Sequence, residues 1–165
     1  MAARKIIGID PGLSNTGWAV IEINGQHLKY VKSGTISTLS SQKIEQRLSK
    51  IYAEMQLALQ AHNPTEAAIE DVYVNNNPLS SLKLGQARAA SILAASNYGL
   101  EVFEYAPRLI KKSITGSGKA EKEQIMAMVK YLMPLAFPNN EHESDAIAVA
   151  IAHSSMSRYK SIIES

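Results

Sequence analysis

The sequence predicts an α/β protein built on a five-stranded mixed sheet, three antiparallel strands followed by two parallel ones, with helices on both faces. Two observations lead to this prediction. Three strand-like runs open the chain and are joined by short turns, whereas later strand-like runs alternate with helical segments. Short turns join antiparallel neighbours, and strand–helix–strand connections join parallel ones.

The first three strands are expected over residues 4–10, 16–23 and 27–36. The first contains the apolar run Ile6–Ile9, which is typical of a strand buried inside a sheet. The dipeptide Asn24-Gly25 separates the second strand from the third. Both of its residues tolerate positive φ, so it is a strong indication of a hairpin.

Helices and strands alternate in the rest of the chain. Apolar side chains at helical spacing predict a helix over 42–62, ended by Asn63-Pro64 and followed by a strand over 65–73. Asn77-Pro78 is typical of a helix start. The elements expected from there on are a helix to about Tyr98 closed by Gly99, a strand over 101–105, a short helix over 107–113, a Gly-Ser-Gly loop at 116–118, and helices over about 120–132 and 143–158, separated by Pro134 and Pro138.

This order of elements is expected of a ribonuclease-H-like fold, although other α/β folds share it. The whole chain, residues 1–165, is expected to form one domain, since it contains no internal repeat, linker or low-complexity tract. With 45% hydrophobic and 19% charged residues it has the composition of an ordinary globular protein. The lack of cysteine excludes disulfides and thiolate metal sites, and a cytoplasmic location is expected because there is no signal peptide or membrane-length apolar run.

The net charge of +2 permits nucleic-acid binding without requiring it. The distribution of charge is more informative, because five basic residues fall within a short segment: Arg108, Lys111, Lys112, Lys119 and Lys122. A solvated helix–loop surface is the more common explanation of such a run, so this segment alone does not establish a DNA-binding surface.

Acidic residues occur where apolar strands end. Asp10 directly follows the first strand, and Glu70 lies in the apolar run of the fourth. Burying a lone carboxylate is unfavourable unless a partner or a cation compensates it. The last helix starts with a further group in which His142 and Asp145, like Glu141 and Asp145, share a helical face: Glu141, His142, Glu143 and Asp145.

Converging carboxylates repel one another and need a cation to stay ionised. Mg²⁺ or Mn²⁺ suits such oxygen ligands, and two such ions about 4 Å apart stabilise the attacking and leaving oxygens of a phosphodiester. The sequence therefore predicts a metal-dependent nuclease site with two ions, formed by Asp10, Glu70 and the start of the last helix.

Each of these residues also has a simpler explanation. Asp10 precedes Pro-Gly and could serve turn chemistry. Glu70 and Asp71 point to opposite strand faces, and periodicity does not say which of them faces solvent. The acids at 141–145 could be first-turn residues favoured by the helix dipole, and His142 could be an ordinary surface residue.

Five segments closely resemble the RuvC family of Holliday junction resolvases, in the right order along essentially the whole chain: IIGIDPGLSNTGWAVI, AAIEDVYVNNN, SLKLGQARAA, VFEYAPRLIKKSITGSGKAEK and SDAIAVAIAH. The resemblance implies a bacterial, ribonuclease-H-like crossover junction endodeoxyribonuclease. Such an enzyme acts as a homodimer with Mg²⁺ or Mn²⁺ and nicks two strands of a four-way DNA junction symmetrically during recombination and repair. A branch-migration helicase complex is the partner that the resemblance implies.

The same resemblance implies roles for individual residues. Asp10, Glu70 and Asp145 match the family's metal ligands. His142 falls where many members carry Asp and some carry His, which leaves Glu141 or Glu143 as conceivable substitutes. The basic residues expected near the phosphate or in contact with DNA are Lys111, Lys119 and Lys122, of which Lys122 would neutralise phosphate charge.

Two further expectations concern an aromatic residue and a helix. Tyr73 falls where members carry an aromatic residue that stacks on a base near the crossover, although it could instead belong to the core. Residues 82–95 resemble the dimer-forming helix. Its small residues suggest a close helix–helix approach, but they could also pack on the protein's own sheet: Ala87, Ala89, Ala90, Ala94 and Ala95.

Two other functional classes fit the sequence less well than a junction endonuclease. The phosphate-binding hairpin of the actin and sugar-kinase superfamily resembles IGIDPGLSNTG, but those proteins need two such domains and are far longer. A non-catalytic junction-binding module would not need to retain Asp10, Glu70 and Asp145.

Overall fold

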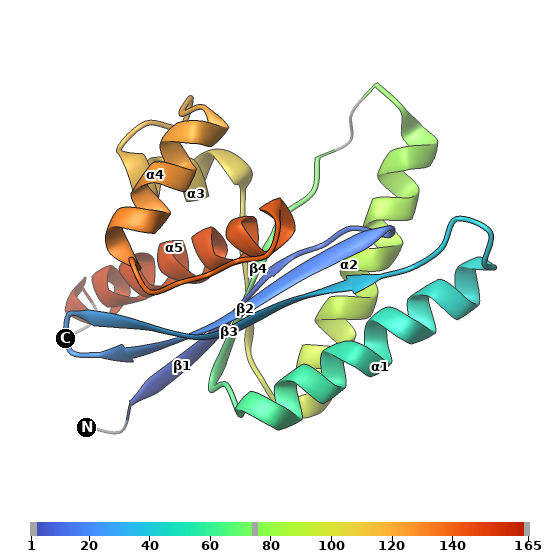
Figure 1. Cartoon of the computed structure of the whole chain (residues 1–165), viewed down its shortest axis with the longest axis horizontal. Helices are drawn as coiled ribbons and strands as arrows, with labels where there is room; N and C mark the ends of the chain where they lie inside the picture. The colour runs from blue at the N-terminus through green and yellow to red at the C-terminus, as the bar shows by residue number, and fades with distance from the viewer. Residues whose placement is uncertain (1–2, 74–75, 164–165) are drawn as a thin grey trace.

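A five-stranded sheet forms the centre of the computed structural model, in the order β3-β2-β1-β4-β5 (Figure 1). The structure describes residues 3–73 and 76–163, with side chains as far as Ser157. The strands are β1 (Arg4–Asp10), β2 (Asn15–Asn24), β3 (His27–Ser37), β4 (Glu66–Glu70) and β5 (Val102–Tyr105).

The pairing of the strands confirms the predicted mixed sheet. β1 and β3 both run antiparallel to β2, whereas β4 is parallel to both β1 and β5. The β2–β3 hairpin closes at Asn24 paired with His27, and Gly25 has a φ of 60°, as the Asn-Gly signature predicts.

Helices cover both faces of the sheet (Figure 1). One face packs against α1 and α2, and the other against α5, which α3 and α4 flank. The helices are α1 (Ile44–His62), α2 (Pro78–Tyr98), α3 (Pro107–Thr115), α4 (Lys122–Leu132) and α5 (Glu141–Ile163). Within the described part of the chain, no helix combines the length and apolar character that a membrane span requires.

Several predicted boundaries were wrong by a few residues. The fourth strand ends at Glu70 and not at 73, because its partner β5 ends at Tyr105 and the last pairing bond runs from the Asp71 amide to the Tyr105 carbonyl. The last helix begins at Glu141 and extends to Ile163, beyond the expected 143–158. The short helix expected over 107–113 runs to Thr115.

The early start of α5 follows from a capping residue that the prediction overlooked. The side chain of Asn140 accepts a hydrogen bond from the Glu143 amide at 3.0 Å, and its carbonyl accepts one from Ser144. An asparagine three residues before a glutamate is the sequence pattern of such a cap, so residues 140–143 carried this information.

Two glycines allow α5 to lie directly on the sheet. A Cβ at Gly8 would collide with the carbonyl oxygen of Ala146, and a Cβ at Gly17 would collide with that of His142. Gly8 lies in β1 and pairs with Ala19 of β2, and Gly17 of β2 pairs with Asp10. The start of α5 is therefore held against the sheet next to Asp10.

This close approach predicts that Gly17→Ala destabilises the protein by about 3 kcal/mol, because the added methyl group must displace the first turn of α5. Gly85→Ala is the matched control. Gly85 is an exposed residue of α2 with open space where a Cβ would be, so this change should stabilise the protein by about 1 kcal/mol. Chemical unfolding of both variants measures the two effects, and equal stability of the two would contradict the proposed packing.

Candidate active site

Asp10 and Glu70 lie side by side at the end of two parallel strands. Ile9 pairs with Ile69 in the β1–β4 register, and the two acids follow these residues. Ile9 and Ile69 pack on the side of α1 and α2, so alternation along the strands turns both acids toward α5. The structure thus resolves which of the neighbouring acids of β4 faces α5: it is Glu70, and Asp71 points to the other face.

The environment of this pair opposes ionisation. Burial raises the pKa of Asp10 to about 7, and the negative charge of Asp145 adds to the effect; the side chain of Asp10 is only 17% exposed. Burial and the neighbouring Asp10 raise the pKa of Glu70 to about 8. A hydrogen bond between the two carboxyl groups lowers the pKa of Asp10 and raises that of Glu70, as expected if Glu70 holds the shared proton.

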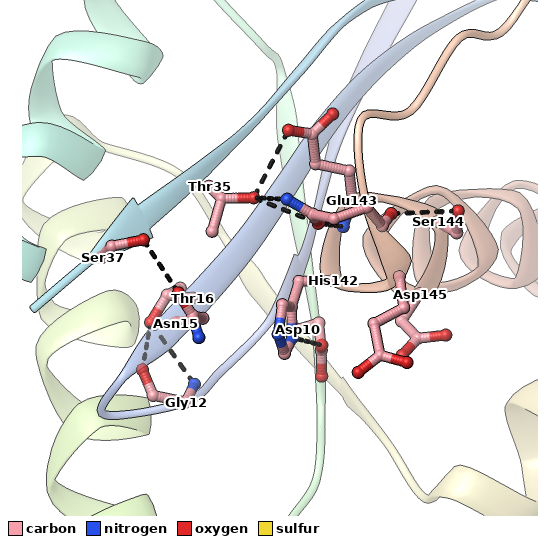
Figure 2. A network of polar contacts seen from close by, with 12 residues as sticks. Asp10, Gly12, Asn15, Thr16, Thr35, Ser37, His142, Glu143, Ser144 and Asp145 are labelled. Carbon is pink, nitrogen blue, oxygen red and sulfur yellow. Dashed lines mark hydrogen bonds and ion pairs between the residues drawn. The ribbon is translucent and has the colours of Figure 1, made fainter.

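The first turns of α5 bring two more predicted residues to this pair, and Figure 2 shows His142 and Asp145 on the side of Asp10. The Nδ1 atom of His142 lies 3.6 Å from Oδ2 of Asp10. Burial raises the pKa of Asp145, and its charge acts on both Asp10 and Glu70. Because His142 and Asp145 are three residues apart on the helix, both face the sheet end where the two strand acids lie.

A lysine from α4 borders the acidic group. The Nζ atom of Lys122 donates to Oε2 of Glu141 at 2.5 Å and lies 3.8 Å from Oδ2 of Asp145. The hydrogen bond with Glu141 raises the pKa of Lys122 and lowers that of Glu141, so both groups are charged at neutral pH. Glu141 itself is exposed, at the edge of the site.

Glu143 points away from this group and toward β3 (Figure 2). It is only 3% exposed, and it accepts hydrogen bonds from Ser33 Oγ at 2.6 Å, from Thr35 Oγ1 at 3.3 Å and from the Asn139 amide at 3.0 Å. Burial raises the pKa of Glu143, but these hydrogen bonds outweigh that effect and hold it below its usual range. Glu143 therefore anchors the start of α5 to the sheet.

The turn after β1 is closed by a residue other than Asp10. The Thr16 hydroxyl donates to the Gly12 carbonyl at 2.6 Å and accepts from the Gly12 amide at 3.3 Å (Figure 2). The carboxyl group of Asp10 instead contacts Glu70 and His142. Turn chemistry is thus not the reason for an aspartate at this position.

The donor set fits a hard divalent cation. Asp10, Glu70 and Asp145 offer carboxylate oxygens whose ionisation is opposed by burial and mutual repulsion, and a cation would relieve both effects. Among residues 3–73 and 76–163, however, no three acidic or histidine side chains already surround a common point closely enough to hold an ion. The site thus contains the right groups next to one another, and binding would require side-chain rotations.

Two hollows adjoin the acids. One, of about 300 Å³, is lined by Asp10, Glu70 and Tyr73 among others. The second, of about 190 Å³, is lined by Glu70, Lys111, Lys122 and Asp145 among others.

The residues predicted to contact DNA are mostly at the surface. Tyr73 is 62% exposed, so it does not belong to the core. Lys119 is exposed in the loop before α4 and lines neither hollow. Of the asparagines beside Tyr73, Asn76 and Asn77 are exposed, and Asn75 lies outside the described residues.

Comparisons with known proteins found a matching family model and similar relatives. A family model described as "Crossover junction endodeoxyribonuclease RuvC" matches residues 6–153. A protein of that description from Azorhizobium caulinodans is 48% identical over 149 residues, covering 90% of this chain and 88% of the relative. One from Methylocella silvestris is 42% identical over 164 residues, covering 99% and 93%. The solved structure described as T. thermophilus RuvC in complex with Holliday junction substrate has a TM-score of 0.89 and 27% identity, covering 95% of this chain and 96% of that chain.

The raised pKa values predict how stability depends on pH. In the unfolded chain Asp10 and Glu70 have pKa values near ~3.9 and ~4.3. In the folded protein their pKa values are about 7 and about 8. In the native state these two groups therefore bind more protons over this range, so their contribution to the stability of the metal-free protein is greatest below the unfolded values and is lost as pH rises through about 8.

Thermal unfolding with a metal chelator should thus show a larger loss of stability between pH 6 and about 8.5 for the wild type than for Asp10→Asn. Mg²⁺ should stabilise the wild type more at the higher pH, because it binds the deprotonated pair. Identical pH profiles for wild type and variant would refute the assigned shifts.

Proposed function

The chain belongs to the RuvC family of crossover junction endodeoxyribonucleases, and on that premise we propose that it resolves four-way DNA junctions by paired symmetric nicks during recombination and repair. One observation supports this most strongly: the buried, adjacent carboxyl groups of Asp10 and Glu70, with pKa values raised to about 7 and about 8. Such a pair gains most from a divalent cation, the cofactor of many phosphodiester-cleaving enzymes. A solved relative described as a complex with Holliday junction substrate supports the choice of substrate.

Divalent-metal dependence follows from the family, and we propose Mg²⁺, with Mn²⁺ as the alternative and two ions per site. The side chains that would hold the metal are Asp10, Glu70, His142 and Asp145. When bound, the metal supplies Lewis-acid stabilisation of charge on the phosphate and makes the attacking water more acidic. We favour His142 over its neighbours as the fourth ligand, since His142 already lies 3.6 Å from Asp10, whereas Glu143 is bonded to β3 and Glu141 lies at the exposed edge of the site.

Three residues around the acids have proposed roles toward DNA. Lys122 would exchange its bond to Glu141 for one to the scissile phosphate and neutralise charge there. Lys111 lines the same hollow as Glu70 and would bind the backbone nearby. Tyr73, exposed beside the other hollow, would stack on a base near the crossover. For Lys119, exposed in the loop before α4, we propose a phosphate contact farther from the cut.

A homodimer would supply the two active sites that paired nicking requires. We propose that α2 forms the interface, but not through all of its small residues, because Ala87, Ala94 and Ala95 are buried in the protein's own core. The exposed face of α2 is better suited. It presents Leu82, Gln86, Ala89 and Leu93, which recur at helical spacing.

The cellular setting is also part of the proposal. The relatives are bacterial proteins and the proposed substrate is DNA, which supports a cytoplasmic location for the proposed activity. The resemblance to the family further implies cooperation with a branch-migration helicase complex. All proposed ligands lie on one sheet and one helix packed against it, which supports treating residues 1–165 as a single nuclease domain.

Changing Asp10→Asn should abolish metal-dependent cleavage, with the rate of junction nicking falling by at least about a hundredfold. Affinity for the junction should remain within about threefold, because it comes mostly from phosphate contacts elsewhere. Rates and affinities would be measured on the same labelled four-way junction. Glu45→Gln removes an exposed carboxylate on α1 and should leave both quantities unchanged. Near-normal nicking by Asp10→Asn would place the chemistry elsewhere.

A second prediction concerns His142. Imidazole is a poorer ligand for Mg²⁺ than for Mn²⁺, whereas carboxylate suits both. His142→Asp should therefore raise the ratio of the Mg²⁺-supported to the Mn²⁺-supported cleavage rate by about tenfold. Glu141→Gln should leave that ratio within about twofold. If Glu141→Gln changes the ratio and His142→Asp does not, Glu141 is the ligand.

A further inference from the structure

Arg88, in the middle of α2, reaches the end of the strand that carries Glu70. Its Nε atom donates to the carbonyl oxygen of Glu70 at 3.3 Å. One terminal nitrogen lies 2.6 Å from Oε1 of Glu104 and 3.2 Å from Oδ1 of Asp71. The guanidinium of Arg88 therefore joins the ends of β4 and β5 to α2. Its side chain is largely buried, at 17% exposed.

The contact is made from the face of the sheet opposite to the acidic group. Glu70 faces α5, whereas Asp71 and Glu104 face α2, where they meet Arg88. Ala87 and Ser91, which flank Arg88 on the inner side of α2, are completely buried. These small residues let the helix lie close to the sheet, and the arginine reaches the strand ends from there.

Among the residues that the structure describes, few other hydrogen bonds restrain the strand end. The Asp71 amide donates to the Tyr105 carbonyl at 2.8 Å, and the Asp71 carboxylate accepts from the Val72 amide at 2.8 Å. Beyond that point the chain leaves the sheet toward the exposed Tyr73. Arg88 thus binds two neighbouring residues. One is Glu70, the proposed metal ligand, and the other is Asp71, where the segment leading to Tyr73 begins.

The charge of Arg88 is already used within the protein. Two carboxylates contact the guanidinium, and the arrangement satisfies its planar, multi-donor geometry in a way that a lysine would not. Isolated exposed ion pairs contribute little to stability, but a guanidinium shared among three acceptors fixes their relative positions. These contacts point to an internal role and not to a phosphate contact.

We propose that Arg88 is a positioning residue, which holds the C-terminal end of β4 and thereby the carboxyl group of Glu70 against Asp10. This inference rests on the proposed function, because it takes Glu70 to be a metal ligand. It also gives the dimer helix proposed above a direct connection to the metal site of the same protomer.

The test compares Arg88→Gln, Arg88→Lys and the wild type by two measurements that need no cleavage. Hydrogen exchange at the Asp71 amide should be at least about tenfold faster in Arg88→Gln, because the strand end opens more often. The dissociation constant for Mn²⁺, measured by calorimetry, should rise about tenfold, as is usual when a group supporting a metal ligand is removed. Arg88→Lys should restore only part of either quantity, since a lysine lacks the planar fork.

Lys50→Gln serves as the charge-matched control. Lys50 is exposed on α1 and pairs with Glu54, so its replacement should change neither measurement. A general loss of stability would accelerate exchange throughout the sheet, whereas the proposed role accelerates it selectively at 70–73 and weakens metal binding.

Uniform acceleration across the sheet, or unchanged Mn²⁺ affinity in Arg88→Gln, would overturn the proposal. A wild-type protein that binds Mn²⁺ at this site without cutting junctions would contradict the proposed function instead. In that case the exchange and metal-binding results for Arg88 would still show whether it positions Glu70.

Discussion

The close approach of α5 to β1 and β2 is the constraint on which the site depends. It exists because Gly8 and Gly17 carry no side chain where the carbonyl oxygens of Ala146 and His142 lie. Gly17 pairs with Asp10, so this contact brings the first turn of α5 next to the acid at the end of β1. Without this approach, the strand acids and the helix residues would belong to separate layers of the fold.

Neighbouring residues of α5 have different tasks because each helical position turns by about 100° relative to the last. Glu141 is bonded to Lys122 at the exposed edge, His142 lies beside Asp10, and Glu143 is buried against β3. The anchoring by Glu143 holds the helix start in place, and the glycines let it come close. Together they place Asp145 one turn further along, where its charge acts on both strand acids.

The sheet and most element boundaries were predictable from local patterns, such as the Asn-Gly turn and the capping residues of α2. Asp10, Glu70 and Asp145 were also identifiable as candidates, because acids at the ends of apolar strands and at a helix start need an explanation. His142 was singled out chiefly by the resemblance to the RuvC family. The sequence alone did not show whether Glu70 or Asp71 faces α5, since the side-chain period of two is satisfied either way.

The roles of Glu143 and Arg88 depend on partners distant in sequence, Ser33 and Glu104, so no local pattern revealed them. Similarly, the alanines of α2 that pack inward could not be told from those that face outward.

The most direct test of this account is anomalous diffraction from crystals of the protein grown with Mn²⁺. The account predicts an anomalous peak bound by carboxylate oxygens of Asp10, Glu70 and Asp145, with His142 as a nitrogen ligand and its side chain rotated from the position described above. A peak bound by other residues, or no peak at these acids under saturating Mn²⁺, would contradict the claim that this buried acidic group is the metal site of a junction endonuclease.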